Sequence, residues 1–449
     1  MVIVKTAGGA IEGTTSDGID CFLGIPYAHA PIGSMRFKHA QLKTSWSSPY
    51  QAMRVQAIPP QPQNKLETFF SSTPRSFVQD EDCLYLNIWR QANDNYLKPV
   101  IIYFYGGGFI NGHGTAELYT PEHIVAQEDV IVVTFNYRLG ALGYLDWSYF
   151  NSNYDKNNGL SDQLAALKWV HTFIDSFGGD TNNVTLMGQS AGSMSIMALM
   201  QMPHAVTYFK QVILLSGTLK LDSADVGTTK ARHFEQLMEQ RYGHHDITLL
   251  HSSQLLQLMD DDEQARGKSK GLELIYAPIA TSDMSLPLQN NRKPMLVCIT
   301  HDEGDIYITG EEHKLTPRRF TEVMALYDIY VKPHDVQSAV QQSQIITYSY
   351  FLAPALHFLK HFSTTNQAWL ARFDWCIPLH HDYGSAYHIL DVIFWFGKMD
   401  ILAAHQVSQL THARRLSKQM IRDLAQFART GTCHWQPYSA THQQPYVYK

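Results

Sequence analysis

Short apolar runs alternate along the chain with longer stretches that have the spacing of a helix. The runs are rich in β-branched and aromatic residues, and they cover residues 100–105, 130–135, 184–187, 212–215, 295–299 and 369–373. Strands that are apolar along their whole length are typical of a mostly parallel sheet that is buried on both faces.

Helical spacing of apolar residues fits three segments between or after these runs, 163–173, 193–201 and 405–429. We expect Ser161 or Asp162 to cap the first of these helices, because short polar side chains accept hydrogen bonds from the free N–H groups of a helix start. Strands that alternate with helices predict a doubly wound α/β fold, with a central sheet flanked by helices.

Two segments, 222–290 and 310–365, have a mixed and less regular pattern. We interpret them as cap-like helical insertions into one domain that spans residues 1–449, and not as separate domains. No run of about 18 apolar residues occurs, so the sequence predicts no transmembrane helix.

Composition narrows the function further. Only 17% of the residues are charged and the net charge is −6, which argues against a basic nucleic-acid surface. The 22 histidines include no His-Glu-x-x-His spacing, and we expect neither a metal nor a cofactor. The five cysteines and the absence of a signal-like N-terminus fit a reducing compartment, so we expect a cytoplasmic protein of bacterial type.

One short motif suggests a nucleophile. Gly188-Gln189-Ser190-Ala191-Gly192 is a Gly-x-Ser-x-Gly sequence that follows a predicted strand and precedes a helix-compatible stretch. A nucleophilic serine needs a sharp strand-to-helix turn that exposes its hydroxyl, and glycines leave room for that turn. The alternative is a structural turn flanked by glycines.

A second glycine-rich segment could stabilise negative charge. Gly106-Gly107-Gly108-Phe109 follows the predicted strand at residues 100–105. Backbone N–H groups of Gly107 and Gly108, with that of Ala191 after the serine, would form the oxyanion hole that acyl transfer requires. A plain glycine-rich turn is the competing interpretation.

Four further blocks resemble the type B carboxylesterase family, which includes cholinesterases and bacterial para-nitrobenzyl esterases. They are Phe22-Leu23-Gly24-Ile25-Pro26-Tyr27-Ala28, Glu81-Asp82-Cys83-Leu84-Tyr85-Leu86-Asn87-Ile88, Asn136-Tyr137-Arg138-Leu139-Gly140 and Phe177-Gly178-Gly179-Asp180. The resemblance implies the α/β-hydrolase fold, with helical insertions that form an active-site gorge.

The resemblance also implies a catalytic triad. The family's acid falls on Glu303 of Asp302-Glu303-Gly304, with Asp302 and Asp305 as rivals, and its histidine falls on His388. His388 would take the proton from Ser190, and Glu303 would orient the imidazole. The same pattern implies structural ion pairs of Arg36 with Glu81 and of Arg138 with Asp162.

The sequence departs from the cholinesterases at three points. Gln189 stands where they carry a glutamate, and the loop before Glu81 has Phe69 and Phe70 but no tryptophan to stack on a quaternary ammonium. A choline ester is therefore an unfavourable substrate. The cysteine that would pair with Cys83 in secreted relatives is missing, which implies a free buried thiol at Cys83.

The sequence thus predicts a serine carboxylesterase that cleaves neutral esters of short or medium acyl chains. Its partner would be a small ester, and the enzyme would be a monomer or homodimer. Apolar pocket residues are expected among Phe109, Ile306, Tyr307 and Phe396, beside Gln189, with core packing as the alternative for each apolar residue. An amidase, a carbamate hydrolase and, less favoured, a lipase stay open, as does a non-catalytic binding protein of the same fold.

Overall fold

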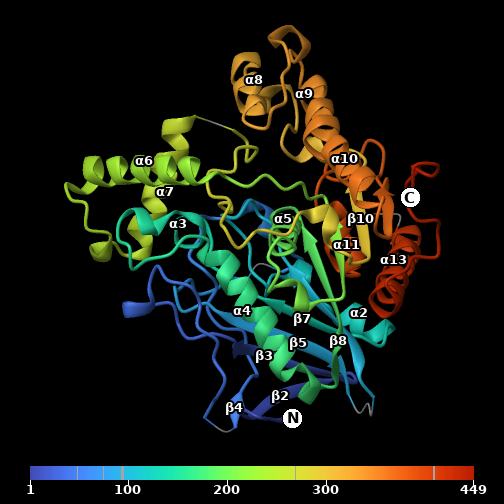
Figure 1. Ribbon diagram of the computed structural model, residues 1–449. Helices are drawn as coiled ribbons and strands as arrows, with labels where there is room; N and C mark the ends of the chain where they lie inside the picture. The colour runs from blue at the N-terminus through green and yellow to red at the C-terminus, as the bar shows by residue number, and fades with distance from the viewer. Residues whose placement is uncertain (48, 74, 93–95, 268, 408–409) are drawn as a thin grey trace.

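A single twisted sheet runs through the molecule. The computed structural model describes residues 1–47, 49–73, 75–92, 96–267, 269–407 and 410–449. The strand order along the sheet is β1-β2-β3-β5-β7-β6-β8-β9-β10-β11-β12, and β4 pairs with β2 outside this path. Figure 1 shows the sheet between α4 on one side and α13 on the other.

The predicted buried strands are confirmed, and they form the parallel part of the sheet. They are β6 (Lys98–Phe104), β7 (Ile131–Phe135), β8 (Gly179–Gln189), β9 (Gln211–Leu215), β10 (Met295–Thr300) and β11 (Ala368–Phe373). Each pairs in parallel with its neighbours in the order β7-β6-β8-β9-β10-β11. Every residue of β7, β9 and β10 is buried, because helices cover both faces of this part.

The remaining strands were not predicted. β1 (Val2–Thr6), β2 (Gly9–Ser16), β3 (Ile19–Pro26) and β5 (Tyr85–Gln91) extend the sheet with antiparallel pairing, whereas β4 (Tyr50–Gln51) and β12 (Tyr446–Tyr448) pair in parallel. In β2 only two positions are buried, so its sequence lacks a continuous apolar run.

Helices pack on both faces of the sheet. The long ones are α4 (Asn158–Phe173), α5 (Ala191–Leu199) and α13 (Leu410–Thr430), which correspond to the three predicted segments. Shorter helices are α1 (Lys65–Phe69), α2 (Glu122–Gln127), α3 (Gly140–Tyr144), α11 (Leu390–Trp395) and α12 (Met399–Ala404). Residues 408 and 409 of the segment expected at 405–429 lie outside the described part of the chain.

The expected cap of α4 is wrong. The helix begins at Asn158, and Asn157, with a φ of 56°, is its N-cap residue. Ser161 and Asp162 lie inside the first turns, where Ser161 Oγ accepts a hydrogen bond from the Ala40 N–H. Asp162 is engaged by Arg138 instead, so its side chain serves the tertiary structure and not the helix start.

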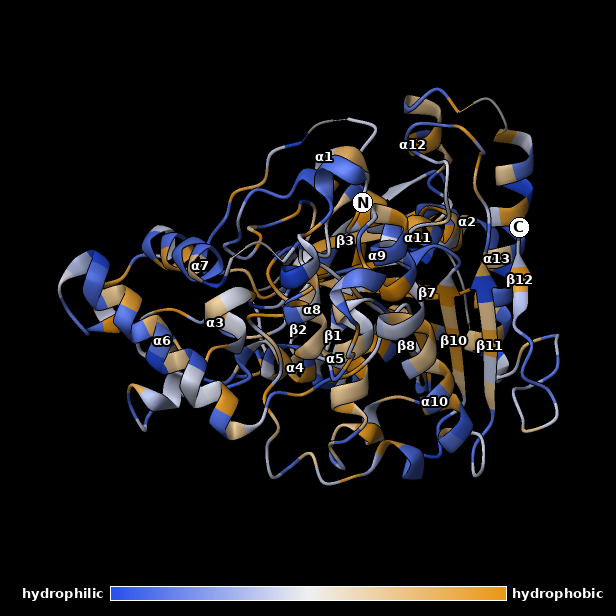
Figure 2. Cartoon of the chain, turned by 90° about the horizontal axis from the view of Figure 1, so that it is seen from above, coloured by the Kyte–Doolittle hydropathy of each residue, from blue (hydrophilic) through white to orange (hydrophobic). Residues whose placement is uncertain are grey.

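The two insertions lie at the end of the molecule that is remote from β2 and β4 (Figure 1). The first contributes α6 (Ala224–Tyr242) and α7 (Ser252–Arg266). The second contributes α8 (Pro317–Ala325), α9 (Ala339–Ile345), a π-helical turn (Ile346–Leu352) and α10 (Ala353–Phe362). Around α8 and α9, a small hydrophobic cluster that includes Phe320, Val323 and Met324 is separate from the main core. In Figure 2, β10 and β11 are mostly hydrophobic, whereas α7 carries hydrophilic residues on its outer surface.

Both ion pairs implied by the family pattern are present. Arg36 Nη2 lies 2.7 Å from Glu81 Oε1, and Arg138 Nη2 lies 2.6 Å from Asp162 Oδ1 in the core. Cys83 is a free, buried thiol, as expected. Within the described ranges, no helix combines the length and the apolar character that a membrane crossing requires.

Candidate active site

Ser190 occupies a strained turn between β8 and α5. Its φ of 54° and ψ of −122° are unfavourable for a residue with a side chain. A Cβ atom on Gly188 would lie 2.6 Å from the carbonyl carbon of Gly192, and one on Gly192 would collide with the carbonyl oxygen of Phe104. The Ser190 N–H donates to Leu215 O at 2.8 Å, which fastens the turn to β9. The two glycines of the motif are therefore required by close backbone packing.

Glu303 and His388 form a buried pair beside this turn. His388 Nδ1 lies 2.5 Å from Glu303 Oε2, and the other carboxylate oxygen accepts hydrogen bonds from Ser216 Oγ at 2.6 Å and from the Thr300 N–H at 2.8 Å. Three hydrogen bonds thus fix the carboxylate, and the carboxylate fixes the imidazole.

The two rival carboxylates face elsewhere. Asp302 accepts a hydrogen bond from the Ala386 N–H at 3.0 Å and pairs with the half-exposed side chain of His301. Asp305 accepts a hydrogen bond from Ser343 Oγ. Neither contacts His388, so the geometry singles out Glu303.

The second nitrogen of His388 contacts Gln189. His388 Nε2 lies 3.0 Å from Gln189 Nε2, and within the described residues Ser190 makes no hydrogen bond to His388. Catalytic hydrogen bonds are often long in unliganded enzymes and shorten when substrate binds. The sequence offered no signal for the contact between Gln189 and His388.

The glycine-rich loop packs directly against the serine turn. Gly107 and Gly108 have φ values of 114° and 60°, which favour glycine, and a Cβ on Gly106 would lie 2.8 Å from the Gln189 carbonyl oxygen. The N–H groups of Gly107, Gly108 and Ala191 find no acceptor in the described part of the protein. These three donors are therefore available to a ligand atom.

A cavity of about 670 Å³ opens onto these groups. Near the serine it is bounded by the glycine loop, and its walls carry many apolar side chains, among them Ile110, Leu118, Met194, Leu274, Ile306, Tyr307, Phe351 and Ile389. The His388 ring lies 4.9 Å from the Phe351 ring and 5.7 Å from the Tyr307 ring, measured between centroids. Two insertions and the N-terminal part of the chain thus supply the walls.

Of the five expected pocket residues, Gln189, Ile306 and Tyr307 line this cavity and two aromatic residues do not. Phe109 is buried, with its ring 4.7 Å from that of Tyr144, and it is not part of the cavity lining. Phe396 is also buried, with its ring 4.7 Å from that of Tyr103. For both residues the core-packing alternative is correct.

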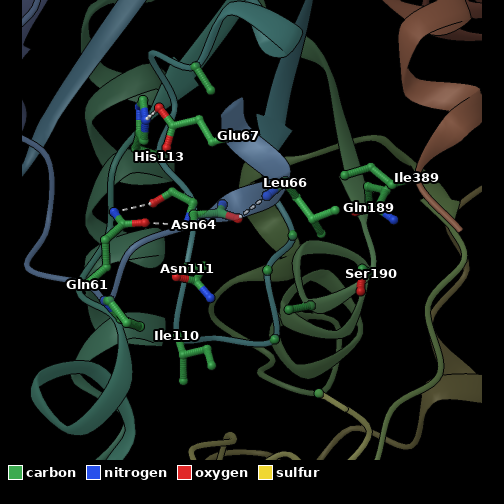
Figure 3. Close-up of a pocket in the computed structure, with 18 of the residues that line it drawn as sticks. Gln61, Asn64, Leu66, Glu67, Ile110, Asn111, His113, Gln189, Ser190 and Ile389 are labelled. Atoms are coloured by element: carbon green, nitrogen blue, oxygen red, sulfur yellow. Dashed lines mark hydrogen bonds and ion pairs between the residues drawn. The ribbon is translucent and has the colours of Figure 1, made fainter. Parts of the chain in front are cut away.

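The far wall of the cavity contains a second polar cluster that the sequence did not indicate. His113 Nε2 lies 2.8 Å from Glu67 Oε1 on α1, and His113 Nδ1 lies 2.7 Å from Thr115 Oγ1. In Figure 3 this pair and Gln61 lie on the opposite side of the cavity from Gln189 and Ser190. The Gln61 amide bonds to both the N–H and the carbonyl of Gly112, so it holds the loop that carries Asn111.

A further buried carboxyl lies near the pair of Glu303 and His388. Asp391 Oδ2 accepts a hydrogen bond from Trp395 Nε1 at 3.1 Å, whereas its Oδ1 has no partner in the described structure. Burial, together with the nearby charge of Glu303, raises the pKa of Asp391 to about 7. Its charge therefore changes near neutral pH.

Comparison with known proteins agrees with the geometry. The chain matches the carboxylesterase family over residues 1–448. It is 34% identical over 446 residues to para-nitrobenzyl esterase of Bacillus subtilis, covering 96% of this chain and 90% of the relative. It is also 34% identical to phenmedipham hydrolase of Pseudarthrobacter oxydans, over 55% of this chain and 49% of that one.

A solved structure of a thermophilic PNB esterase superposes with a TM-score of 0.89 at 30% identity, over 99% of this chain and 95% of the other. The likeness therefore covers the sheet, the serine turn and both insertions. The chain belongs to the carboxylesterase family, has the α/β-hydrolase fold, and is a hydrolase of carboxylic esters that is similar to para-nitrobenzyl esterase.

Proposed function

We propose that this carboxylesterase cleaves neutral esters of short or medium acyl chains through an acyl-enzyme intermediate. Ser190 is the nucleophile, His388 the general base and acid, and Glu303 the group that orients the imidazole. The observation that carries the proposal is the 2.5 Å contact between His388 Nδ1 and Glu303 Oε2 beside the strained serine turn.

In the first step, Ser190 Oγ attacks the ester carbonyl while His388 Nε2 takes the hydroxyl proton. The imidazolium then passes this proton to the alcohol oxygen as the carbon–oxygen bond breaks, and the alcohol leaves. Water then attacks the acyl-enzyme by the same two proton transfers and releases the carboxylic acid. Glu303, held by Ser216 and Thr300, stabilises the positive ring in both steps.

The oxyanion that forms in each step would bind to the N–H groups of Gly107, Gly108 and Ala191. These donors have no other acceptor in the described structure, and all three residues line the cavity together with Ser190. Loss of one such donor costs about 10²–10³ in rate in other acyl-transfer enzymes.

The substrate range follows from the chemistry of the cavity. Next to Ser190 the cavity presents the uncharged amide of Gln189 and apolar side chains such as Met194 and Phe351. An amide in place of a carboxylate at position 189, next to the nucleophile, favours a neutral ester over a choline ester. The name of the Bacillus relative, para-nitrobenzyl esterase, supports an aryl-bearing alcohol as one accepted leaving group.

The experiment that tests the proposal is a rate profile over para-nitrophenyl esters of increasing acyl length, with a choline ester and an amide for comparison. We expect fast turnover of short acyl groups, little choline-ester turnover, and loss of all ester hydrolysis in Ser190→Ala. The exposed Ser47, which lies outside the cavity lining, provides the matched Ser47→Ala control, which should keep wild-type rates. A preference for the choline ester, or an active Ser190→Ala enzyme, would refute the proposal.

A further inference from the structure

The free enzyme pairs the reactive nitrogen of His388 with an amide and not with the serine. Gln189 Nε2 lies 3.0 Å from His388 Nε2, and both side chains are almost fully enclosed, with 1% and 6% of the two residues exposed. An amide nitrogen can only donate, so His388 Nε2 must accept. This arrangement requires a neutral imidazole whose single proton sits on Nδ1, facing Glu303.

We propose that Gln189 is a positioning residue that holds His388 in the free enzyme as the neutral imidazole with its proton on Nδ1, the form that can accept the proton of Ser190. The proposal rests on the triad roles proposed above. In this role Gln189 acts through His388, and it must yield Nε2 to Ser190 when substrate binds.

The orientation of the amide supports this role. Gln189 Oε1 packs against Gly106 of the glycine-rich loop, so closely that a Cβ atom on Gly106 would collide with it. If the amide turned by 180°, Oε1 would face Nε2, and an oxygen can pair only with a protonated Nε2. The orientation that the structure shows, with Gln189 Nε2 facing the ring, therefore pairs only with an unprotonated Nε2 of His388.

A carboxylate at position 189 would behave differently. Glutamate has the same shape but can only accept, so it would pair with the imidazolium and add a second negative charge beside a ring that already contacts Glu303. An opposite charge within about 4–6 Å favours the charged form of a titratable group by roughly 1–3 pH units. Gln189 thus keeps the base uncharged at lower pH than glutamate would.

Other titratable groups surround the pair and must be separated from its effect. Glu303 and Tyr307 face His388 from the turn after β10, Asp391 lies three residues along the chain, and Tyr119 lines the cavity. Burial raises the pKa of both tyrosines far above its ordinary value, so they stay neutral in the assay range. Asp391, with a pKa raised to about 7 by burial, titrates in the same window.

Across the cavity, His113 Nε2 contacts Glu67 Oε1 at 2.8 Å. This pair contacts neither Gln189 nor His388 among the described residues, and all variants below leave it intact.

The test is the pH dependence of kcat/KM for a neutral ester between pH 5 and 9. It compares wild type with Gln189→Glu, first alone and then with Asp391→Asn added to both proteins. The acidic limb of Gln189→Glu should move to higher pH by about one unit or more, a loss of tenfold or more at pH 6. At pH 9 its kcat/KM should return to within a few-fold of wild type. The shift should persist with Asp391→Asn, which removes the competing titration.

Asn111→Asp is the matched charge control. This variant adds the same charge to the cavity lining. Figure 3 places Asn111 away from Gln189, and Asn111 makes no contact with His388 in the described structure. Its acidic limb should move by less than half the shift of Gln189→Glu. Equal shifts in the two variants would mean that the cavity field, and not the contact with His388, sets the profile, and this would overturn the inference.

A second measurement reads the proton directly. In Ser190→Ala protein with ¹⁵N-labelled histidine, the Nε2 resonance of His388 should be that of an unprotonated nitrogen at pH 7, and Gln189→Glu should convert it to a protonated one. A wild-type acidic limb in Gln189→Glu, or a uniform loss of rate at every pH, would overturn the inference. A different result would refute the proposed triad, namely ester hydrolysis that survives Ser190→Ala.

Discussion

Ser216 Oγ donates a hydrogen bond to Glu303 Oε1 at 2.6 Å, so the end of β9 holds the carboxylate that contacts His388. Ser216 itself is buried and has a φ of 49°, a conformation that costs energy for a residue with a side chain. This backbone conformation places the Ser216 hydroxyl within hydrogen-bonding distance of Glu303.

Removal of that hydroxyl should slow the enzyme without abolishing it. In Ser216→Ala, Glu303 keeps its bonds to Thr300 and His388 but loses one of three. A hydrogen bond to a charged group contributes about 1.5–3 kcal/mol, and if half of this is felt in the transition state, kcat should fall by roughly 3- to 13-fold. Steady-state kinetics with a para-nitrophenyl ester measures the effect; an unchanged kcat would mean that Ser216 does not support Glu303.

The serine turn should be intolerant of any side chain at Gly192. In Gly192→Ala the new Cβ would collide with the carbonyl of Phe104, a backbone atom that cannot move independently of β6. We expect a loss of about 3 kcal/mol or more in the free energy of unfolding. Gly243→Ala is the control without close packing: φ is 72° there, but no atom lies within 4 Å of a new Cβ.

Gly243→Ala should lose only about 1 kcal/mol, the cost of the backbone conformation. Urea denaturation of the two variants measures the difference between them. Similar losses would show that close packing does not explain the glycine at position 192.

The buried carboxyl of Asp391 should make stability depend on pH. Its pKa is raised to about 7 in the folded protein and is near 4 in the unfolded chain. Between these values the folded state binds more protons, so this group's contribution to stability is greatest below pH 4 and is lost as the pH rises to 7.

Asp391→Asn removes this titration. Relative to wild type, the variant should gain stability as the pH rises from 5 to 8, by up to a few kcal/mol. Urea unfolding at the two pH values provides the comparison. If the stability difference between the proteins stays constant with pH, the raised pKa is contradicted.

The buried ion pair of Arg138 and Asp162 should matter far more than an exposed one. Asp162→Asn would leave the enclosed guanidinium without its counter-charge, which costs about 3–5 kcal/mol. Glu322 pairs with Arg318, whose side chain is 90% exposed, so Glu322→Gln should cost less than about 1 kcal/mol. Thermal unfolding of both variants tests the contrast, and equal losses would be inconsistent with it.

The sequence predicted the parallel part of the sheet because its strands are buried on both faces and therefore carry uninterrupted apolar runs. It did not predict β1 or β2, in which polar residues interrupt the apolar ones and several positions are exposed. The start of α4 was misplaced because Asp162, a good capping residue, pairs with Arg138 in the core. Tertiary contacts therefore determine both the pairing of these strands and the start of α4.

At the site, local motifs indicated Ser190 and the glycine loop, since the constraints on those turns are local. The family resemblance placed the acid on Glu303 and left Asp302 and Asp305 as rivals, because a sequence does not show that neighbouring residues of one turn face different ways. The contact of Gln189 with His388 joins residues 199 positions apart, and no sequence pattern reports such a pair. Phe109 and Phe396 were misassigned because an apolar residue next to a motif fits a pocket and a core equally well.

The proposed mechanism depends on Ser190 as the nucleophile. Incubation with a para-nitrophenyl organophosphonate, followed by digestion and mass spectrometry, identifies the residue that is labelled. We expect one covalent adduct, on the peptide that contains Ser190, with loss of esterase activity in proportion to labelling and no adduct in Ser190→Ala. Labelling at another residue, or an adduct that survives in Ser190→Ala, would contradict it.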